Sequence, residues 1–215
     1  MTLQLPTSQL KPFRIPPALD QAQSFHVIGC DQDEWCDMWF MDFKYDSVLV
    51  FGPQTQNSAR ILRTRFPGVT IHHSFQPLAL IDFRKIPTTN KLLILIDCQS
   101  NVFNENRDIR EIHLAGRYFD TSVVSILHDQ LETGYDQRWL LPLSIRSNIT
   151  YLIAFPSVDL QVLFQCFGLA SKSQMKFAHE FQARTAKANC ALIIDNTIYA
   201  DDRAFLYQPI SDIMR

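Results

Sequence analysis

Seven short apolar runs, separated by stretches of helical or loop character, most constrain the fold of this chain. They cover residues 25–28, 47–51, 69–72, 92–96, 122–127, 150–155 and 191–194. Most of them are continuous and rich in β-branched and aliphatic residues, without the alternation of a half-exposed strand. This pattern is typical of strands buried on both faces of a parallel sheet, so we expect an α/β fold with right-handed crossovers.

Helical segments are expected between these runs, at residues 58–65, 107–118, 158–168 and 171–187. The first 24 residues carry four prolines and little periodicity, which indicates an extended N-terminal arm. Residues 25–215 are expected to form a single domain, because 215 residues with 47% hydrophobic content suffice for one continuous core.

Composition and charge exclude several classes of protein. The formal net charge of −2 gives no global sign of nucleic-acid binding. No apolar run is long enough to span a bilayer, and the first residues lack the pattern of a signal peptide. The five cysteines are odd in number and scattered, which suits a reducing compartment better than a disulfide framework. We therefore expect an intracellular protein, and no metal site, since Cys30 and Cys36 lack further ligands nearby.

The loop of residues 29–36 follows the first apolar run and precedes a segment, 37–43, that is expected to open a helix. The phosphate-binding pattern G-x-x-x-x-G-K-[ST] occupies this context, where its backbone N–H groups surround phosphates. Gly29 matches the first glycine of that pattern. Glu34, Trp35 and Cys36 replace the second glycine, the lysine and the Mg-binding hydroxyl.

The character of the loop opposes binding of a triphosphate. Asp31, Asp33 and Asp37 make it acidic, so an anion would meet repulsion instead of a positive anchor. Trp35 and Trp39 lie four residues apart and share one face if the chain from Asp37 onward is helical. Either both pack in the core of a pocket vacated by nucleotide, or Trp35 fills the old phosphate site and holds the domain in one state.

The apolar run that ends at Asp97 has the form of a Walker B segment, whose carboxylate holds the Mg ion of a nucleotide. Cys98 follows at the place where working ATPases carry a second carboxylate to polarise water. If the register is shifted by one, Ile96 replaces the metal-binding acid instead. Either register leaves one acid where two are needed, and an Asp at a strand end is also a common turn residue.

Matching segments in the right order extend from residue 25 to residue 195. They are 27–29, 48–55, 66–72, 97–98, 109–118, 141–149 and 189–196, of which 141–149 is the most specific. Together they resemble the genome-packaging ATPases of nucleocytoplasmic large DNA viruses, the poxvirus-type branch of the FtsK–HerA group of P-loop NTPases. The resemblance implies a P-loop NTPase-like three-layer fold with a mostly parallel central sheet.

The resemblance also implies roles for single residues. It assigns vestigial catalytic roles to Asp97, His128 and Arg146, and degenerate nucleotide-binding positions to Gly29, Trp35 and Cys36. His128 stands where the family has a sensor glutamine. Arg146 matches an arginine that reaches a neighbouring subunit's nucleotide, with pairing to a local carboxylate as the alternative. Arg117 matches the arginine of a Gly-Arg-His motif, or caps the C-terminal end of its helix.

These losses predict a pseudo-ATPase, because phosphoryl transfer depends on positioning and electrostatic stabilisation, and several of the parts that supply them are missing. No cofactor is expected, or Mg-ATP if residual activity remains. One alternative is a weakly active ATP-hydrolysing DNA-packaging motor that uses Asp97, His128 and Arg146. The other is a DNA-binding module without hydrolysis, which would use one of two basic helices, Arg60, Arg63 and Arg65 or Lys172, Lys176, Arg184 and Lys187.

Expected partners follow from the resemblance. They are further copies of the chain in a homo-oligomer, an active packaging ATPase in a hetero-oligomer, capsid or portal proteins, and double-stranded DNA. The expected location is the host cytoplasm or viral factory, with the virion as a further candidate.

Overall fold

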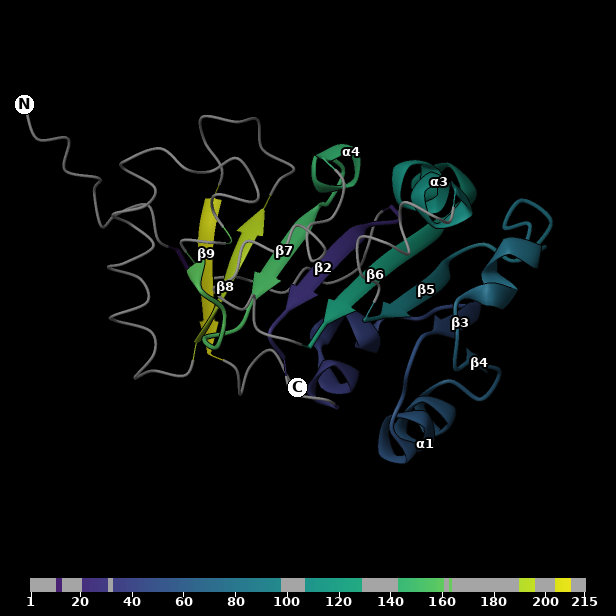
Figure 1. The fold of residues 1–215 in the computed structure, drawn as a ribbon, viewed down its shortest axis with the longest axis horizontal. Coiled ribbons are helices and arrows are strands. Elements are labelled where there is room, and N and C mark those ends of the chain that lie inside the picture. The colour runs from purple at the N-terminus through teal and green to yellow at the C-terminus, as the bar shows by residue number, and fades with distance from the viewer. Residues whose placement is uncertain are drawn as a thin grey trace, which may run out of the picture.

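The structure, a computed structural model, describes residues 11–12, 21–30, 33–97, 107–128, 143–160, 163, 190–195 and 204–209. Its centre is one twisted sheet whose strands follow the order β1-β9-β8-β7-β2-β6-β5-β3-β4 (Figure 1). The strands are β1 (Lys11–Pro12), β2 (Ser24–Ile28), β3 (Ser47–Phe51), β4 (Thr70–His72), β5 (Lys91–Ile96), β6 (Thr121–Leu127), β7 (Tyr151–Ala154), β8 (Cys190–Asp195) and β9 (Ala204–Pro209). Strands β2 to β8 confirm all seven predicted runs, each to within one residue at either end.

Most of the sheet is parallel, as predicted. From β7 through β2, β6, β5 and β3 to β4, every neighbouring pair runs parallel. β8 runs antiparallel to both β7 and β9, which the sequence did not predict. β1 lies within the segment predicted as an arm and pairs with β9.

Helices cover both faces of the sheet, which confirms the three-layer α/β architecture (Figure 1). One face carries α1 (Gln56–Arg65) and the 3-10 helices η2 (Glu34–Asp37) and η3 (Trp39–Asp42), and the other carries α3 (Arg107–Ala115) and α4 (Leu143–Arg146). Strand β2 is buried along its whole length between these layers. Its Phe25 and Val27 pack on the α1 side and its Ile28 packs on the α3 side.

Two predicted helices are confirmed with adjusted ends. α1 begins at Gln56, two residues earlier than predicted, because the Thr55 side chain caps it by accepting a hydrogen bond from the Ser58 N–H. The helix predicted at 107–118 is present as α3, continued by the 3-10 helix η5 (Gly116–Phe119). The helix predicted at 171–187, and all of 158–168 except residues 158–160 and 163, lie outside the described residues.

The helix expected at residues 37–43 is wrong. Two 3-10 turns, η2 and η3, stand there, and Met38 between them has extended backbone with φ −66° and ψ 147°. Four consecutive apolar side chains, from Met38 to Met41, are at most 1% exposed. A surface α-helix buries one stripe of its side chains, so it cannot direct all four into the core. Trp35 and Trp39 therefore do not share a helical face, although both are buried.

Two histidines are buried on the α3 side of β2 and β6. Burial lowers the pKa of His113 to about 3. Burial, together with the neighbouring His113, lowers the pKa of His26 to about 3 against an opposing hydrogen bond with Ser125. The Ser125 hydroxyl lies 2.8 Å from Nε2 of His113. Both rings are therefore neutral in the folded protein at neutral pH.

We expect the free energy of unfolding to fall as the pH drops below about 6.5. Unfolding restores the ordinary histidine pKa near 6.5, so the unfolded chain binds more protons than the folded one between about pH 3 and 6.5. Each histidine contributes a slope of up to about 1.4 kcal/mol per pH unit in that range. Urea titrations at several pH values measure the slope.

The matched variants for this measurement are His113→Gln and His73→Gln. His113→Gln removes one buried ring and is expected to reduce the slope, whereas His73→Gln removes an exposed ring and is expected to leave it unchanged. A wild-type free energy of unfolding that stays constant from pH 6.5 to 4.5 would contradict this account.

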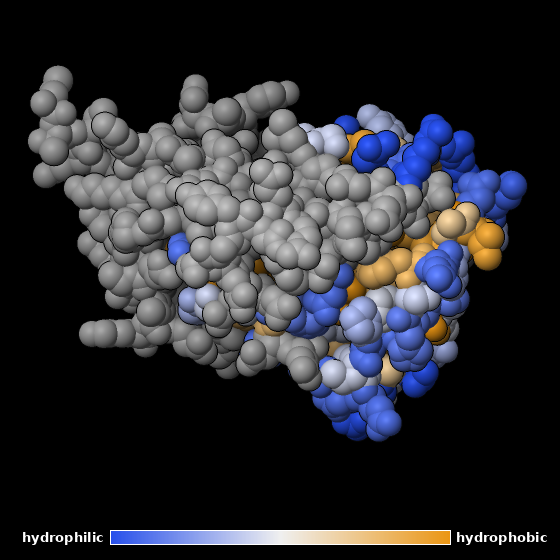
Figure 2. All heavy atoms as spheres, viewed as in Figure 1, coloured by the Kyte–Doolittle hydropathy of each residue, from blue (hydrophilic) through white to orange (hydrophobic). Residues whose placement is uncertain are grey.

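The described surface is polar around α1 and apolar near the β4 end of the sheet. Figure 2 shows an apolar area over the connection between β4 and β5. That connection contains the 3-10 helix η4 (Gln76–Leu80), whose Leu80 is 88% exposed. Among the helices that the structure describes, none has the length and apolar character needed to cross a membrane.

Candidate functional site

Three of the predicted site residues follow neighbouring parallel strands. Gly29 follows β2, His128 follows β6 and Asp97 follows β5, and these strands lie side by side in the sheet. The Gly29 N–H donates to the Leu127 carbonyl at 2.8 Å. The His128 N–H donates to Oδ1 of Asp97 at 3.3 Å. The structure thus brings Gly29, Asp97 and His128 together at the carboxyl edge of the sheet, where open α/β proteins place their sites.

The backbone geometry at Gly29 requires a glycine. Its φ is +76°, and a Cβ at this position would lie 2.4 Å from Cγ2 of Val158 and 2.5 Å from Oγ of Ser157. Ser157 also donates a hydrogen bond to the Gly29 carbonyl at 2.8 Å. The left-handed backbone and the close approach of the chain after β7 therefore require this glycine.

Trp35 and Cys36 belong to the core. They are 1% and 0% exposed and pack among buried side chains such as Val27 and Ile96. A phosphate-binding loop carries its lysine and its metal-binding hydroxyl at these two positions, directed at the nucleotide. Here both side chains are enclosed by hydrophobic groups on the α1 side of the sheet.

Neither the thiol nor the backbone N–H of Cys36 is available to bind a ligand. Burial, with the Asp33 and Asp37 carboxylates, raises the pKa of its thiol to about 12 against the opposing effect of Arg65. The thiol therefore stays protonated at neutral pH, and the thiolate is the form that binds metals. The Cys36 N–H donates to the Asp33 carbonyl at 3.0 Å, so this donor is used within the loop.

Hydrogen bonds hold the Asp33 side chain against the start of α1. Its carboxylate accepts hydrogen bonds from Oγ1 of Thr55 at 2.6 Å and from Nδ2 of Asn57 at 3.0 Å. Burial raises the pKa of Asp33, but hydrogen bonds from Thr55, Asn57 and Ser58, together with nearby His128, bring its net value below the ordinary one. A negative charge is therefore held beside the loop at neutral pH.

The link between Asp33 and Thr55 joins the loop after β2 to the start of α1. Residue spacing along the chain does not reveal it, because the two residues are 22 positions apart. The sequence carries one signal that was not used: Thr55, of a residue type favoured at N-caps, stands shortly before the helix predicted at 58–65.

Replacing Thr55 with alanine is expected to lower the free energy of unfolding by about 1–2 kcal/mol, because α1 loses its N-cap and Asp33 loses a donor. Chemical denaturation measures the change. The control is Thr64→Ala, which removes an exposed hydroxyl in the last turn of α1 that donates to the Arg60 carbonyl. Its effect is expected to stay within about 0.5 kcal/mol. Equal losses in the two variants would contradict a capping role for Thr55.

The His128 ring contacts the chain just after Gly29. Its Nδ1 lies 3.2 Å from the Cys30 carbonyl oxygen and 3.8 Å from the Cys30 sulfur. Asp97 has a left-handed backbone with φ 52°, and its N–H donates to the Ile126 carbonyl at 2.8 Å. Asp97 thus places a carboxylate at the carboxyl end of β5, and Cys98 lies outside the described residues. Within the described part of the chain, no three histidine, cysteine, aspartate or glutamate residues are grouped as a metal site would need.

Arg65, one of the three arginines named for the DNA-binding alternative, is engaged within the protein. Its guanidinium donates to the Cys36 carbonyl and lies 3.4 Å from Oδ1 of Asp37 and 3.8 Å from Oδ1 of Asp42. The acidic η2 and η3 turns are thereby tied to the end of α1. Arg63 is exposed. The second predicted basic helix, with Lys172, Lys176, Arg184 and Lys187, lies outside the described residues.

Arg146 lies away from the other predicted catalytic residues. It is the last residue of α4, shortly before β7 begins at Tyr151, so its backbone is near the amino edge of the sheet. Gly29, Asp97 and His128 lie at the carboxyl edge. An arginine that acts on a neighbouring subunit need not lie near its own subunit's site, so its predicted role stays a prediction.

The chain is similar to known proteins in its fold. No protein-family profile matches the sequence, and no curated protein is significantly similar to it. The fold is similar to that of a solved structure, the genome packaging NTPase B204 from Sulfolobus turreted icosahedral virus 2 in complex with ATPγS. The TM-score is 0.55 at 12% sequence identity, covering 88% of this chain and 98% of that one. The likeness confirms the predicted NTPase-like α/β fold.

Proposed function

We propose that this protein is a catalytically degenerate homologue of viral genome-packaging ATPases that serves as a structural or assembly component in virion morphogenesis or genome packaging. The observation that carries the proposal is the burial of Trp35 and Cys36 at the positions of the P-loop lysine and hydroxyl. The likeness of the fold to a packaging NTPase supports the kind of process. The sequence resemblance favours the poxvirus-type branch of the FtsK–HerA group.

Electrostatics at the strand edge support loss of catalysis. Asp33 and Asp97 place carboxylates beside the loop, and the cation that contacts the loop, Arg65, is paired with Asp37 and Asp42. Phosphoryl transfer needs positive groups aimed at the charge that develops on the phosphate. The described residues of this edge provide the opposite charge, so Mg-ATP would bind weakly or not at all.

A protein that keeps the NTPase-like fold but does not hydrolyse ATP can still serve as a structural subunit of an oligomer. We propose a homo-oligomer, or a hetero-oligomer in which Arg146 reaches the nucleotide of an active packaging ATPase. Capsid or portal proteins and double-stranded DNA are further proposed partners, and the viral factory or the virion is the proposed location. These proposals rest on the sequence resemblance and the likeness of the fold.

The second candidate is a weakly active motor. The observation that favours it is the cluster of Gly29, Asp97 and His128 at the carboxyl edge of the sheet. In this account Asp97 would hold the Mg ion of a bound nucleotide and His128 would contact phosphate or water. A DNA-binding module without hydrolysis is less favoured, because Arg65 is engaged in the loop.

Release of inorganic phosphate from Mg-ATP, with and without linear double-stranded DNA, separates the two candidates. The pseudo-ATPase predicts that the wild-type protein and Asp97→Asn release phosphate equally, at the rate of a protein-free control. A rate that DNA stimulates and Asp97→Asn removes would instead establish the weakly active motor.

A further inference from the structure

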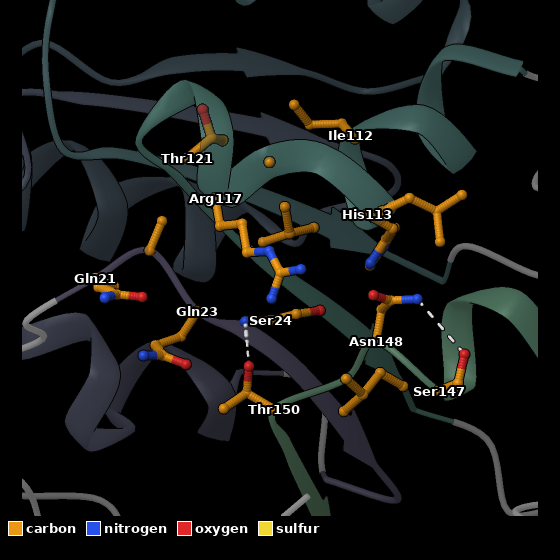
Figure 3. Close-up of a pocket in the computed structure, with 15 residues that line it drawn as sticks. Gln21, Gln23, Ser24, Ile112, His113, Arg117, Thr121, Ser147, Asn148 and Thr150 are labelled. Atoms are coloured by element: carbon orange, nitrogen blue, oxygen red, sulfur yellow. Dashed lines mark hydrogen bonds between the residues drawn. The ribbon is translucent and has the colours of Figure 1, made fainter. Parts of the chain in front are cut away.

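A cavity lies at the amino edge of the sheet, at the opposite end of β2 from the loop that follows it. It has a volume of about 460 Å³ and lies between the starts of β2 and β6, the end of α3, and the turn that follows α4 (Figure 3). This volume falls within the range of small-molecule sites. Its polar walls include Gln23, Ser24, His113, Arg117, Asn148 and Thr150.

The charge of the cavity is positive. Among the residues that line it, Arg117 is the one with a formal charge, and the others are apolar or carry neutral hydroxyl, amide and imidazole groups. Figure 3 shows the Arg117 guanidinium projecting into the space between Ser24 and Asn148. The described residues that line the cavity include no carboxylate, so Arg117 attracts an anion without competition from an acid among them.

Arg117 is not used in an ion pair within the described part of the chain. Its guanidinium contacts Tyr118, with Nη2 at 3.3 Å from the phenol oxygen and the charged carbon 5.1 Å from the ring centroid. Arg117 also lies in the last turn of η5, where a basic side chain interacts favourably with the helix dipole, so the capping role predicted for it stays a prediction. The tyrosine ring orients the side chain and leaves other guanidinium N–H groups to donate to a ligand.

Hydrogen bonds within the protein already fix the polar side chains of the opposite wall, Asn148 and Thr150. Asn148 donates from Nδ2 to the Ser144 carbonyl at 2.8 Å, which fixes its side chain beside the end of α4. Thr150 accepts a hydrogen bond from the Ser24 N–H at 3.1 Å, which joins the starts of β7 and β2. Polar groups held in this way keep their geometry on binding and lose little conformational freedom.

We propose that this cavity binds a small molecule carrying an oxyanion, a phosphate monoester or a carboxylate, anchored by Arg117. A guanidinium recognises both groups through two parallel hydrogen bonds. The surrounding amides and hydroxyls suit a ligand whose remaining part carries hydroxyl groups. The five residues of β2 separate this cavity from the loop after β2 by roughly 17 Å. Binding of an anion here therefore does not depend on whether that loop binds nucleotide.

Titration calorimetry on the full chain tests the proposal, with ribose 5-phosphate, citrate and neutral ribose as probes. We expect saturable one-to-one binding of one of the anions and none of ribose, and the preferred anion distinguishes phosphate from carboxylate. Arg117→Gln is expected to weaken that binding at least tenfold. Arg63→Gln, which removes an equal charge from the exposed face of α1, is expected to leave it unchanged.

A second variant, Asn148→Asp, places a negative charge in the cavity wall and is expected to weaken anion binding as Arg117→Gln does. Circular dichroism checks that both variants keep the fold. Absence of saturable binding of either anion at millimolar concentrations overturns the proposal, as does equal binding by Arg117→Gln and the wild type. If Arg117→Gln changes the mass of an oligomer while no anion binds, the cavity receives an acidic side chain of another subunit, and the small-molecule proposal fails.

Discussion

Replacing Trp35 with lysine is expected to lower the free energy of unfolding by at least about 4 kcal/mol, or to prevent folding. Lysine is the residue that a phosphate-binding loop carries at this position. In this chain the position is 1% exposed, so the substitution removes a large buried ring and places a charged group among apolar side chains. Urea unfolding followed by circular dichroism measures the loss.

The control for this variant is Glu34→Lys, which introduces the same residue one position earlier, where the side chain is half-buried. Its cost is expected to be about 1 kcal/mol or less. A Trp35→Lys protein that is as stable as the wild type and gains affinity for Mg-ATP would show that the loop retains the geometry of a working P-loop.

Replacing Gly52 with alanine is expected to cost roughly 3 kcal/mol or more. Gly52 directly follows β3 with a φ of +111°, and a Cβ there would lie 2.1 Å from the Ile96 carbonyl oxygen. The clash is with the backbone of β5 at the last residue before Asp97, so neighbouring strands must separate at the candidate site. Thermal and urea unfolding measure the effect.

Gly68→Ala is the matched control, because a Cβ at Gly68 would meet no atom within 4 Å. Its effect is expected to stay within about 0.5 kcal/mol. If both glycine variants unfold at the same denaturant concentration, the close contact between β3 and β5 does not constrain the fold.

The central strands were predictable because strands buried on both faces leave continuous apolar runs. β2, β3, β5 and β6 show this directly, since nearly every side chain in them is buried. β1 was not predicted because it has two residues, which is too short for a pattern. The antiparallel direction of β8 and β9 depends on how the chain returns to the sheet, which apolar runs do not specify.

The candidate site was predictable where it depends on strand ends. Gly29, Asp97 and His128 meet because they follow adjacent parallel strands. The hydrogen bond between Asp33 and Thr55 and the ion pairs of Arg65 join segments distant in sequence, so residue patterns alone did not reveal them. The helix expected after the loop was wrong because burial of four consecutive side chains outweighs local helical preference.

Because Trp35 and Cys36 are buried, we expect the loop after β2 not to bind nucleotide. The most direct measurement is titration calorimetry of Mg-ATPγS into the native chain, with Asp97→Asn as the reference for non-specific heat. The account predicts no saturable heat from either protein. Micromolar binding by the native chain that Asp97→Asn weakens would contradict this expectation and would show that the protein binds nucleotide as active packaging ATPases do.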